Sequence, residues 1–199
     1  MTNSAQAAGG GKREAASGSK REQLIASAVE LIYREGVERP TLAQIAEAAG
    51  VPPGNVYYYF KTKDELIEAV IESRAAWVHD LLASLDRRRT PAARLKGLTR
   101  NWLEFSDLTA AHGCPLGSLS VALNDHGGGL DRQASKLFSA PIEWAEGQFR
   151  EMGIRDARDH ALTLLSTVEG AALLSSAFGD PDILVSQVHR LERWIDSLA

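Results

Sequence analysis

Three adjacent tyrosines occur in residues 50–63, GVPPGNVYYYFKTK, a stretch with two lysines and no acidic residue. In a helix packed on a core, only about one position in three or four faces inward, so neighbouring phenols cannot all be buried. Outward tyrosine hydroxyls donate hydrogen bonds to phosphate oxygens, and their rings pack on sugars or thymine methyl groups. Asn55 can form paired hydrogen bonds with adenine. The stretch therefore predicts contact with nucleic acid; an aromatic plug between two domains is the alternative.

Residues 42–59 have the spacing of two short helices joined by a glycine-containing turn, as in a helix-turn-helix. Ala46 is small where the two helices must approach closely, and Gly50, four residues later, allows a left-handed turn. Val56 and Phe60 are four residues apart and would anchor the second helix on the first. The remaining positions of the second helix project away from the core: Gly54, Asn55, Tyr57 and Tyr58.

Two helix starts add phosphate-binding groups to this region. Thr41 is suited to cap the helix that follows it, and Thr62 and Lys63 stand at the start of the helix after the tyrosines. Unpaired backbone N–H groups at helix starts bind phosphates. Gly54 would let the second helix of the pair begin close to the duplex.

The elements that position these groups are all predicted to be helical. Apolar residues recur at helical spacing between caps and glycines, and no stretch alternates with period two for long enough to form a strand. The fold class is therefore all-α, with about nine helices, near residues 20–36, 41–50, 53–59, 62–85, 90–111, 115–123, 130–151, 156–178 and 182–197. Residues 1–19 are too poor in large apolar groups to fold alone and are expected to be a disordered arm.

Composition limits the classes of protein that fit. The 199 residues are 44% hydrophobic, enough for a core, and the net charge of −4 means that any nucleic-acid contact must come from a local patch. A single cysteine excludes an internal disulfide and fits a reducing compartment. The N-terminus lacks the apolar core of a signal peptide, and no window approaches the roughly 18 uncharged apolar residues of a membrane span. We therefore expect a cytoplasmic protein.

The stretch TLAQIAEAAGVPPGNVYYYFKTKDEL closely resembles the signature of the TetR/AcrR family of transcriptional regulators, and the resemblance covers residues 20–66. It implies a homodimer, a roughly palindromic operator DNA, and repression that a small molecule lifts. The helices become longer and more apolar from the fourth one onward, which places a boundary near residue 65, between a DNA-binding domain over 20–65 and a ligand-binding and dimerisation domain over 66–199. The positions that match DNA-contacting residues of the family are Thr41, Pro53, Gly54, Asn55, Tyr57, Tyr58, Tyr59 and Lys63.

Two residues depart from the family pattern. Pro52 stands where a serine or threonine commonly caps the recognition helix, so that cap is replaced or absent. Tyr59 stands where histidine is common. These departures leave room for a second interpretation, an adaptor protein of the same fold that does not bind DNA.

Residues 112–124, HGCPLGSLSVALN, resemble a motif from a branch of the family that includes electrophile-sensing and flavonoid- or multidrug-responsive repressors. Pro115 at a first helical position would place Cys114 beside an N-cap, where free N–H groups stabilise a thiolate and lower its pKa. Cys114 would then be a redox or electrophile sensor, with His112 assisting. The alternative is that Cys114 is a small apolar residue lining a pocket. The scattered histidines give no spacing typical of metal ligands.

Aromatic residues at helical spacing predict the walls of an effector cavity. Trp102 and Phe105 would form one wall; Phe138, Trp144 and Phe149 would form another. Together with Cys114 and Leu116 they favour an apolar or aromatic effector. Glu143 and Glu169 would suit a cationic one, although a lone glutamate is commonly solvated.

The last two helices are expected to form the dimer surface. LTLLSTVEGAALLSSAFG mixes leucines with small residues that allow close helix packing, and the final helix has more apolar surface than a terminal helix needs. The residues chosen for this interface are Leu165, Ser166, Gly170, Leu173, Val188, Leu191 and Trp194.

An enzyme is the competing class, and the sequence gives it no support. It contains no G-x-S-x-G nucleophile elbow, no phosphate-binding loop and no H-E-x-x-H pair. We predict no catalytic residues, no cofactor and no metal. The expected partners are operator DNA, a second copy of the chain and a small-molecule effector.

Overall fold

A computed structural model describes residues 19–124, 126 and 129–199. Apart from Ser19, the segment expected to be a disordered arm lies outside this part of the chain. The described residues form ten α-helices and one 3-10 helix and contain no strand, which confirms the all-α class. The helices are α1 (Lys20–Glu35), α2 (Leu42–Ala48), α3 (Pro53–Tyr59), α4 (Lys63–Leu85), α5 (Pro91–Arg100), η1 (Leu103–Phe105), α6 (Ser106–His112), α7 (Pro115–Ala122), α8 (Leu130–Glu151), α9 (Ala157–Phe178) and α10 (Pro181–Ser197).

The helix predicted over residues 90–111 is divided into α5, η1 and α6. At the division the backbone changes from i→i−4 to i→i−3 hydrogen bonds: the N–H of Trp102 donates to the carbonyl of Thr99, and that of Phe105 to the carbonyl of Trp102, both at 3.3 Å. Such 3-10 turns are tighter than α-helical ones and redirect the chain. This break accounts for the extra helices relative to the nine expected.

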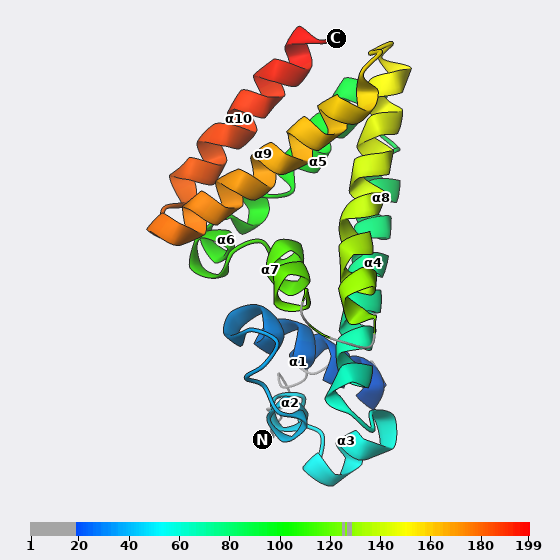
Figure 1. Cartoon of the computed structure of the whole chain (residues 1–199), viewed down its shortest axis with the longest axis vertical. Coiled ribbons are helices and arrows are strands. Elements are labelled where there is room, and N and C mark those ends of the chain that lie inside the picture. Colours follow the sequence, from blue (N-terminus) through cyan, green and yellow to red (C-terminus); the bar gives the residue numbers. More distant parts are fainter. Residues whose placement is uncertain (1–18, 125, 127–128) are drawn as a thin grey trace, which may run out of the picture.

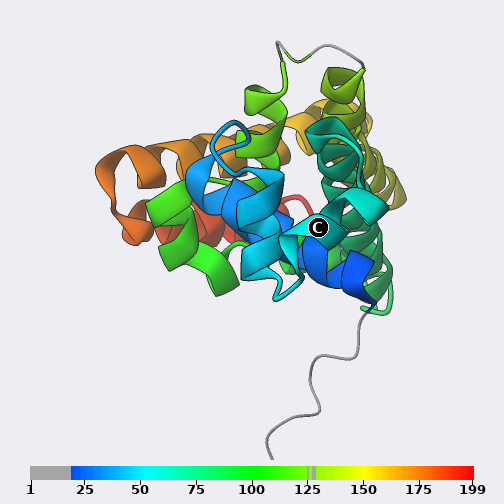
Figure 2. The same ribbon diagram turned by 90° about the horizontal axis from the view of Figure 1, so that it is seen from below.

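Helices α1–α3 lie at one end of the molecule, and α4 runs from them alongside α8 (Figure 1). From below, α1–α3 lie in front of the remaining helices (Figure 2). Buried residues from α1, α4, α5, α7, α8 and α9 form one continuous apolar cluster. The N-terminal helices therefore share a core with the rest of the chain, and α4 belongs to both parts.

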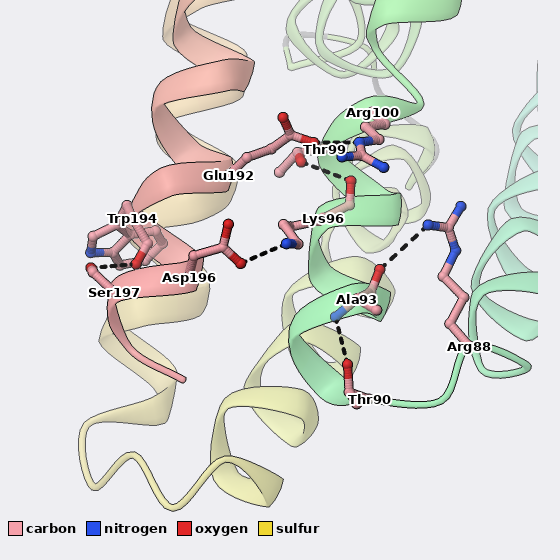
Figure 3. Close-up of polar contacts among 10 residues, drawn as sticks. All are labelled: Arg88, Thr90, Ala93, Lys96, Thr99, Arg100, Glu192, Trp194, Asp196 and Ser197. Atoms are coloured by element: carbon pink, nitrogen blue, oxygen red, sulfur yellow. Dashed lines mark hydrogen bonds and ion pairs between the residues drawn. The ribbon is translucent and has the colours of Figure 1, made fainter.

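Helix α9 packs on both α8 and α10, and α5 packs on α10. Figure 3 shows the polar contacts between α5 and α10. Lys96 on α5 pairs with Asp196 on α10 at 2.5 Å, and Arg100 pairs with Glu192. These pairs fix the register of the C-terminal helix against α5.

Helix α9 is long and apolar enough, by length and composition, to cross a membrane, which corrects the expectation that no window approaches this limit. Its composition has two causes in the fold. One face packs on α8 and α10, and another presents exposed leucines and Phe178 to the outside of this chain.

Candidate nucleic-acid interface and effector cavity

Helices α2 and α3 form a helix-turn-helix at the exposed end of the molecule. Ala46 is fully buried between them, and the turn closes through the Val51 N–H, which donates to the Ala46 carbonyl at 2.9 Å. Gly50 has φ +65°, a left-handed conformation that glycine adopts without strain. The Val56 side chain is fully buried and Phe60 is 2% exposed. These contacts fix which face of α3 points outward.

The outward face of α3 carries two of the three tyrosines. Tyr57 is 53% exposed and Tyr58 78% exposed, and Pro53, Gly54 and Asn55 are exposed as well. Tyr59 differs: it is half-buried against the core, and its ring meets that of Tyr58 edge-on with centroids 5.0 Å apart. Tyr57 and Tyr58 therefore point outward, whereas Tyr59 is half-buried and its ring contacts that of Tyr58.

No side chain caps the start of α3, one of the two outcomes that the sequence suggested. Pro52 occupies the N-cap position with no side-chain hydrogen bond, and Pro53 stands at the first helical position. Because proline has no N–H, one of the helix-start donors that would need a cap is absent. The other N–H groups at this helix start remain without a capping side chain.

Thr41, the N-cap of α2, and Lys63, the first residue of α4, both make contacts within the chain. Thr41 Oγ1 accepts a hydrogen bond from the Gln44 N–H at 3.2 Å, and Gln44 Oε1 accepts one from the Thr41 N–H at 2.9 Å. Lys63 Nζ donates to the Glu38 carbonyl at 2.6 Å and ties the start of α4 to the α1–α2 connection. An ammonium has three donors, so two N–H groups of Lys63 remain for an external acceptor.

A cavity of about 430 Å³ lies above the helix-turn-helix, between α1, α4, η1, α6, α7 and α8. Five of the seven residues predicted for the walls of an effector cavity line it: Trp102, Phe105, Cys114, Leu116 and Phe138. Trp144 and Phe149 do not. The Trp144 indole Nε1 instead donates to Asp86 Oδ1 at 2.8 Å, and the Phe149 ring is fully buried against His160 and Trp194.

A second cavity of about 300 Å³ lies beside the first, toward α1. The two share five lining residues: Val29, Tyr33, Arg34, Arg74 and Pro115. Val29, Tyr33 and Arg34 belong to α1, so both cavities contact a helix that packs on the helix-turn-helix. The Tyr33 hydroxyl lies 3.0 Å from the Leu108 carbonyl and 2.9 Å from the Gly113 carbonyl, so its one O–H hydrogen is shared between α6 and the residue that caps it.

Sequence reasoning missed Tyr33 and Arg74 as cavity residues. Arg74 occupies an inward position of α4, four residues from buried Val70 and four from buried Val78. A charged residue within an apolar stripe was the signal that could have identified it. For Tyr33 there was no comparable signal, because its spacing is that of an ordinary partly buried residue.

The structure contradicts the expected reactivity of Cys114. Its thiol is buried and donates to Glu169 Oε1 at 3.1 Å. Burial and the Glu169 carboxylate raise the pKa of Cys114 to about 12, although hydrogen bonds with the Gly117 and Leu116 backbone act in the opposite direction. Burial also raises the pKa of Glu169. Cys114 is therefore a protonated cavity residue, and the predicted low-pKa thiolate is wrong.

The residues chosen for a dimer surface lie in two different environments. Leu165, Val188 and Leu191 are buried in this chain's own core, and Leu165 also lines the larger cavity. Trp194 is half-buried, and its ring stacks on that of His160 at 5.6 Å. These four do not offer an exposed face. The apolar stripe of α10 packs on α9 and α5 instead, and helical periodicity does not distinguish such packing from contact with a second chain.

Ser166, Gly170 and Leu173 do lie on an exposed face of α9. Leu173 is 69% exposed, and nothing lies within 4 Å of a Cβ built on Gly170. Three further large apolar residues of α9 are exposed and were not predicted for the interface: Leu162, Leu174 and Phe178. Within the described ranges, no group of three or more His, Cys, Asp or Glu side chains is placed to hold a metal ion.

Comparison with known proteins adds independent information on both halves of the chain. Residues 24–70 match the family described as bacterial regulatory proteins, tetR family, and residues 91–188 match the LmrA/YxaF-like transcriptional regulator C-terminal domain. The HTH-type transcriptional regulator BetI of Cronobacter sakazakii is 30% identical over 166 residues, 80% of each protein. An uncharacterized HTH-type transcriptional regulator from the lacX 3′ region of Lactococcus lactis subsp. lactis is 26% identical over 177 residues, 85% of this chain and 90% of that one. The crystal structure of a TetR transcriptional regulator from Legionella pneumophila is similar to 90% of this chain and covers 97% of its own, with a TM-score of 0.78 and 22% identity.

Proposed function

Because the chain belongs to the TetR family of transcriptional regulators, we propose that it is a repressor that binds a palindromic operator as a homodimer and leaves it when a small apolar or aromatic effector binds. Membership of this family makes the protein a DNA-binding regulator and not an enzyme. The operator, the dimer and the effector are the parts that we propose. The cytoplasm, where the chromosome of a bacterium lies, is the proposed location.

The observation that carries the proposal is the outward face of α3. Buried Val56 and Phe60 hold the helix so that Asn55, Tyr57 and Tyr58 project together from the end of the molecule. We assign base contact to Asn55 and phosphate contact to the two tyrosine hydroxyls. The supporting contacts are assigned to Thr41, Pro53, Gly54, Tyr59 and Lys63.

A second copy of the chain would cover the exposed apolar face of α9. Leu173, Leu174 and Phe178 are 69%, 50% and 73% exposed in the isolated chain. Gly170 leaves open space beside them, where a partner helix can approach closely. An isologous contact through this face would join two α3 helices in one particle, and operator binding requires them to match major grooves about 34 Å apart.

Release by the effector follows from the shared position of the cavities. Their walls include α1 and α4, which also position α2 and α3, and the Tyr33 hydroxyl bonds α1 to α6. An effector that prefers a conformation with α4 tilted moves the two recognition helices out of register. The effector shifts the equilibrium between the operator-binding conformation and the tilted one only by the difference between its affinities for these two conformations. A tens-fold loss of operator affinity needs about 2 kcal/mol of coupling.

The test is a gel-shift titration with the DNA that flanks the protein's own gene, using inverted repeats found there as candidate operators. The repressor account expects one dimer per repeat and loss of the complex on addition of an apolar aromatic effector. A ligand that binds the protein but leaves operator affinity unchanged would refute the release mechanism. An adaptor of the same fold would bind none of the repeats.

No observation favours the alternative of a thiol-based sensor. A sensor cysteine needs a thiolate in an accessible position, whereas Cys114 is buried and its pKa is raised to about 12.

A further inference from the structure

Arg74 is a partly buried arginine of α4, and no carboxylate of the described residues pairs with it. It lines both cavities from the inward stripe of α4. Among the described residues, no carboxylate lies within ion-pair distance of its guanidinium, and its electrostatic neighbours are Tyr33 and Cys114. The other cavity guanidinium, Arg34, is paired with Glu30 at 3.0 Å. A partly buried guanidinium is normally paired, because its desolvation is otherwise uncompensated.

The charges that line the larger cavity leave one positive charge in excess. Arg34 and Glu30 cancel each other, and Arg74 has no counterpart. Tyr33 and Cys114 do not supply one, because burial raises the pKa of both groups and keeps them protonated. Glu169 is held against the Cys114 thiol and does not line either cavity. The interior is therefore set for an anion, not for the cation that Glu169 suggested from sequence.

The rest of the larger cavity is apolar and aromatic. Trp77, Trp102, Phe105 and Phe138 contribute rings from three sides of it, and Val78 and Leu116 contribute aliphatic surface. Such walls bind a flat apolar body by area and ring contact. The cavity thus combines a large apolar volume with one unpaired guanidinium at the wall nearest α1.

We propose that the effector is an aromatic anion whose carboxylate, or a group of equivalent charge and geometry, pairs with Arg74 while its rings fill the space between the aromatic walls. The inference deepens the function proposed above and rests on it. A planar guanidinium matches a carboxylate through two parallel N–H···O bonds, which gives the site geometric selectivity as well as charge.

The position of Arg74 also gives the anion a place next to the DNA-binding end. Tyr33 and Val29 of α1 line the same two cavities, so a carboxylate on Arg74 lies against α1. Helix α1 packs on α2 and α4. Neutralising Arg74 therefore changes the charge at the junction where α1, α4 and α6 meet.

A matched pair of probes tests the inference: 2-naphthoate, which is ionised at pH 7, and 2-naphthamide, which has almost the same shape and no charge. Their dissociation constants for the full chain are measured by isothermal titration calorimetry. We expect wild type to bind 2-naphthoate about tenfold or more tightly than 2-naphthamide, in keeping with a charge-assisted pair. Arg74→Met should abolish this preference, Arg74→Lys should restore part of it, and exposed Arg155→Met should leave it intact.

Several outcomes overturn the inference. The inference is wrong if wild type binds the two probes with equal affinity, and it is wrong if neither probe binds; neither result depends on a variant. A preference for 2-naphthoate that survives Arg74→Met in a folded variant, as judged by circular dichroism, places the anion elsewhere.

Operator binding, measured on the same samples without probe, separates this inference from the function on which it rests. If 2-naphthamide binds as well as 2-naphthoate and releases the operator, the anion site is refuted and the repressor stands. If wild type binds no operator at all, the proposed function itself fails.

Discussion

Replacing Tyr57 and Tyr58 together by phenylalanine removes two exposed hydroxyls from α3 and leaves both rings in place. The hydroxyls have no hydrogen-bond partner among the described residues, so the change should not affect folding. In a two-fold dimer each substitution occurs twice, and four contacts to phosphate are lost. At about 1 kcal/mol for each hydrogen bond, operator affinity falls by about 4 kcal/mol, or nearly 1,000-fold.

Fluorescence anisotropy with a labelled operator duplex measures this loss at fixed salt. Because the hydroxyls displace no counterions, the slope of log affinity against log salt should stay the same as in wild type. Tyr59→Phe is the internal comparison, and its effect should be smaller because that ring is half-buried. If the double variant binds within about threefold of wild type and remains dimeric, α3 is not the recognition surface.

Three further changes probe separate parts of the proposal. Lys63→Met should lower the salt slope by about one per protomer in the same anisotropy assay, since one phosphate-neutralising cation is removed; an unchanged slope would show that Lys63 serves only to hold the Glu38 carbonyl. Leu173→Glu should weaken the dimer by about 30- to 1,000-fold in sedimentation velocity, because burial of its 69% exposed side chain contributes roughly 1–2 kcal/mol in each protomer; an unaffected dimer would exclude the α9 face. Cys114 should resist iodoacetamide at pH 8 until urea unfolds the chain, and the free energy of unfolding should fall as pH rises from 9.0 toward 12, because the unfolded thiol ionises first; rapid alkylation of the native protein would contradict its burial.

The DNA-binding end could be predicted in detail because its signals are local. A cap at Thr41, a glycine at the turn and apolar anchors four residues apart determine both the helices and the face of α3 that remains exposed. The spacing also left Tyr59 out of the outward set, and its ring is half-buried. Its contact with DNA was implied only by the family resemblance and stays a prediction.

The cavities and the exposed faces of residues 66–199 were predicted less completely, because they depend on which helices pack against each other. The stripe that includes Val188 and Leu191 has the amphipathic pattern of an interface, yet it packs within the chain. Trp144 has the spacing of a cavity residue, but its indole N–H donates to Asp86 and the residue does not line the cavity. The pKa of Cys114 is raised by burial and by Glu169, 55 residues later in the chain, and no local pattern reveals either cause.

Selection of bound DNA from a random duplex library at moderate salt tests the central claim most directly. If α3 and its two-fold copy read DNA together, the recovered sequences should contain inverted repeats with half-site centres about one helical turn apart, and light scattering should find two chains on each repeat. Recovery of fragments with no shared symmetric sequence, or a single chain on each fragment, would contradict the claim.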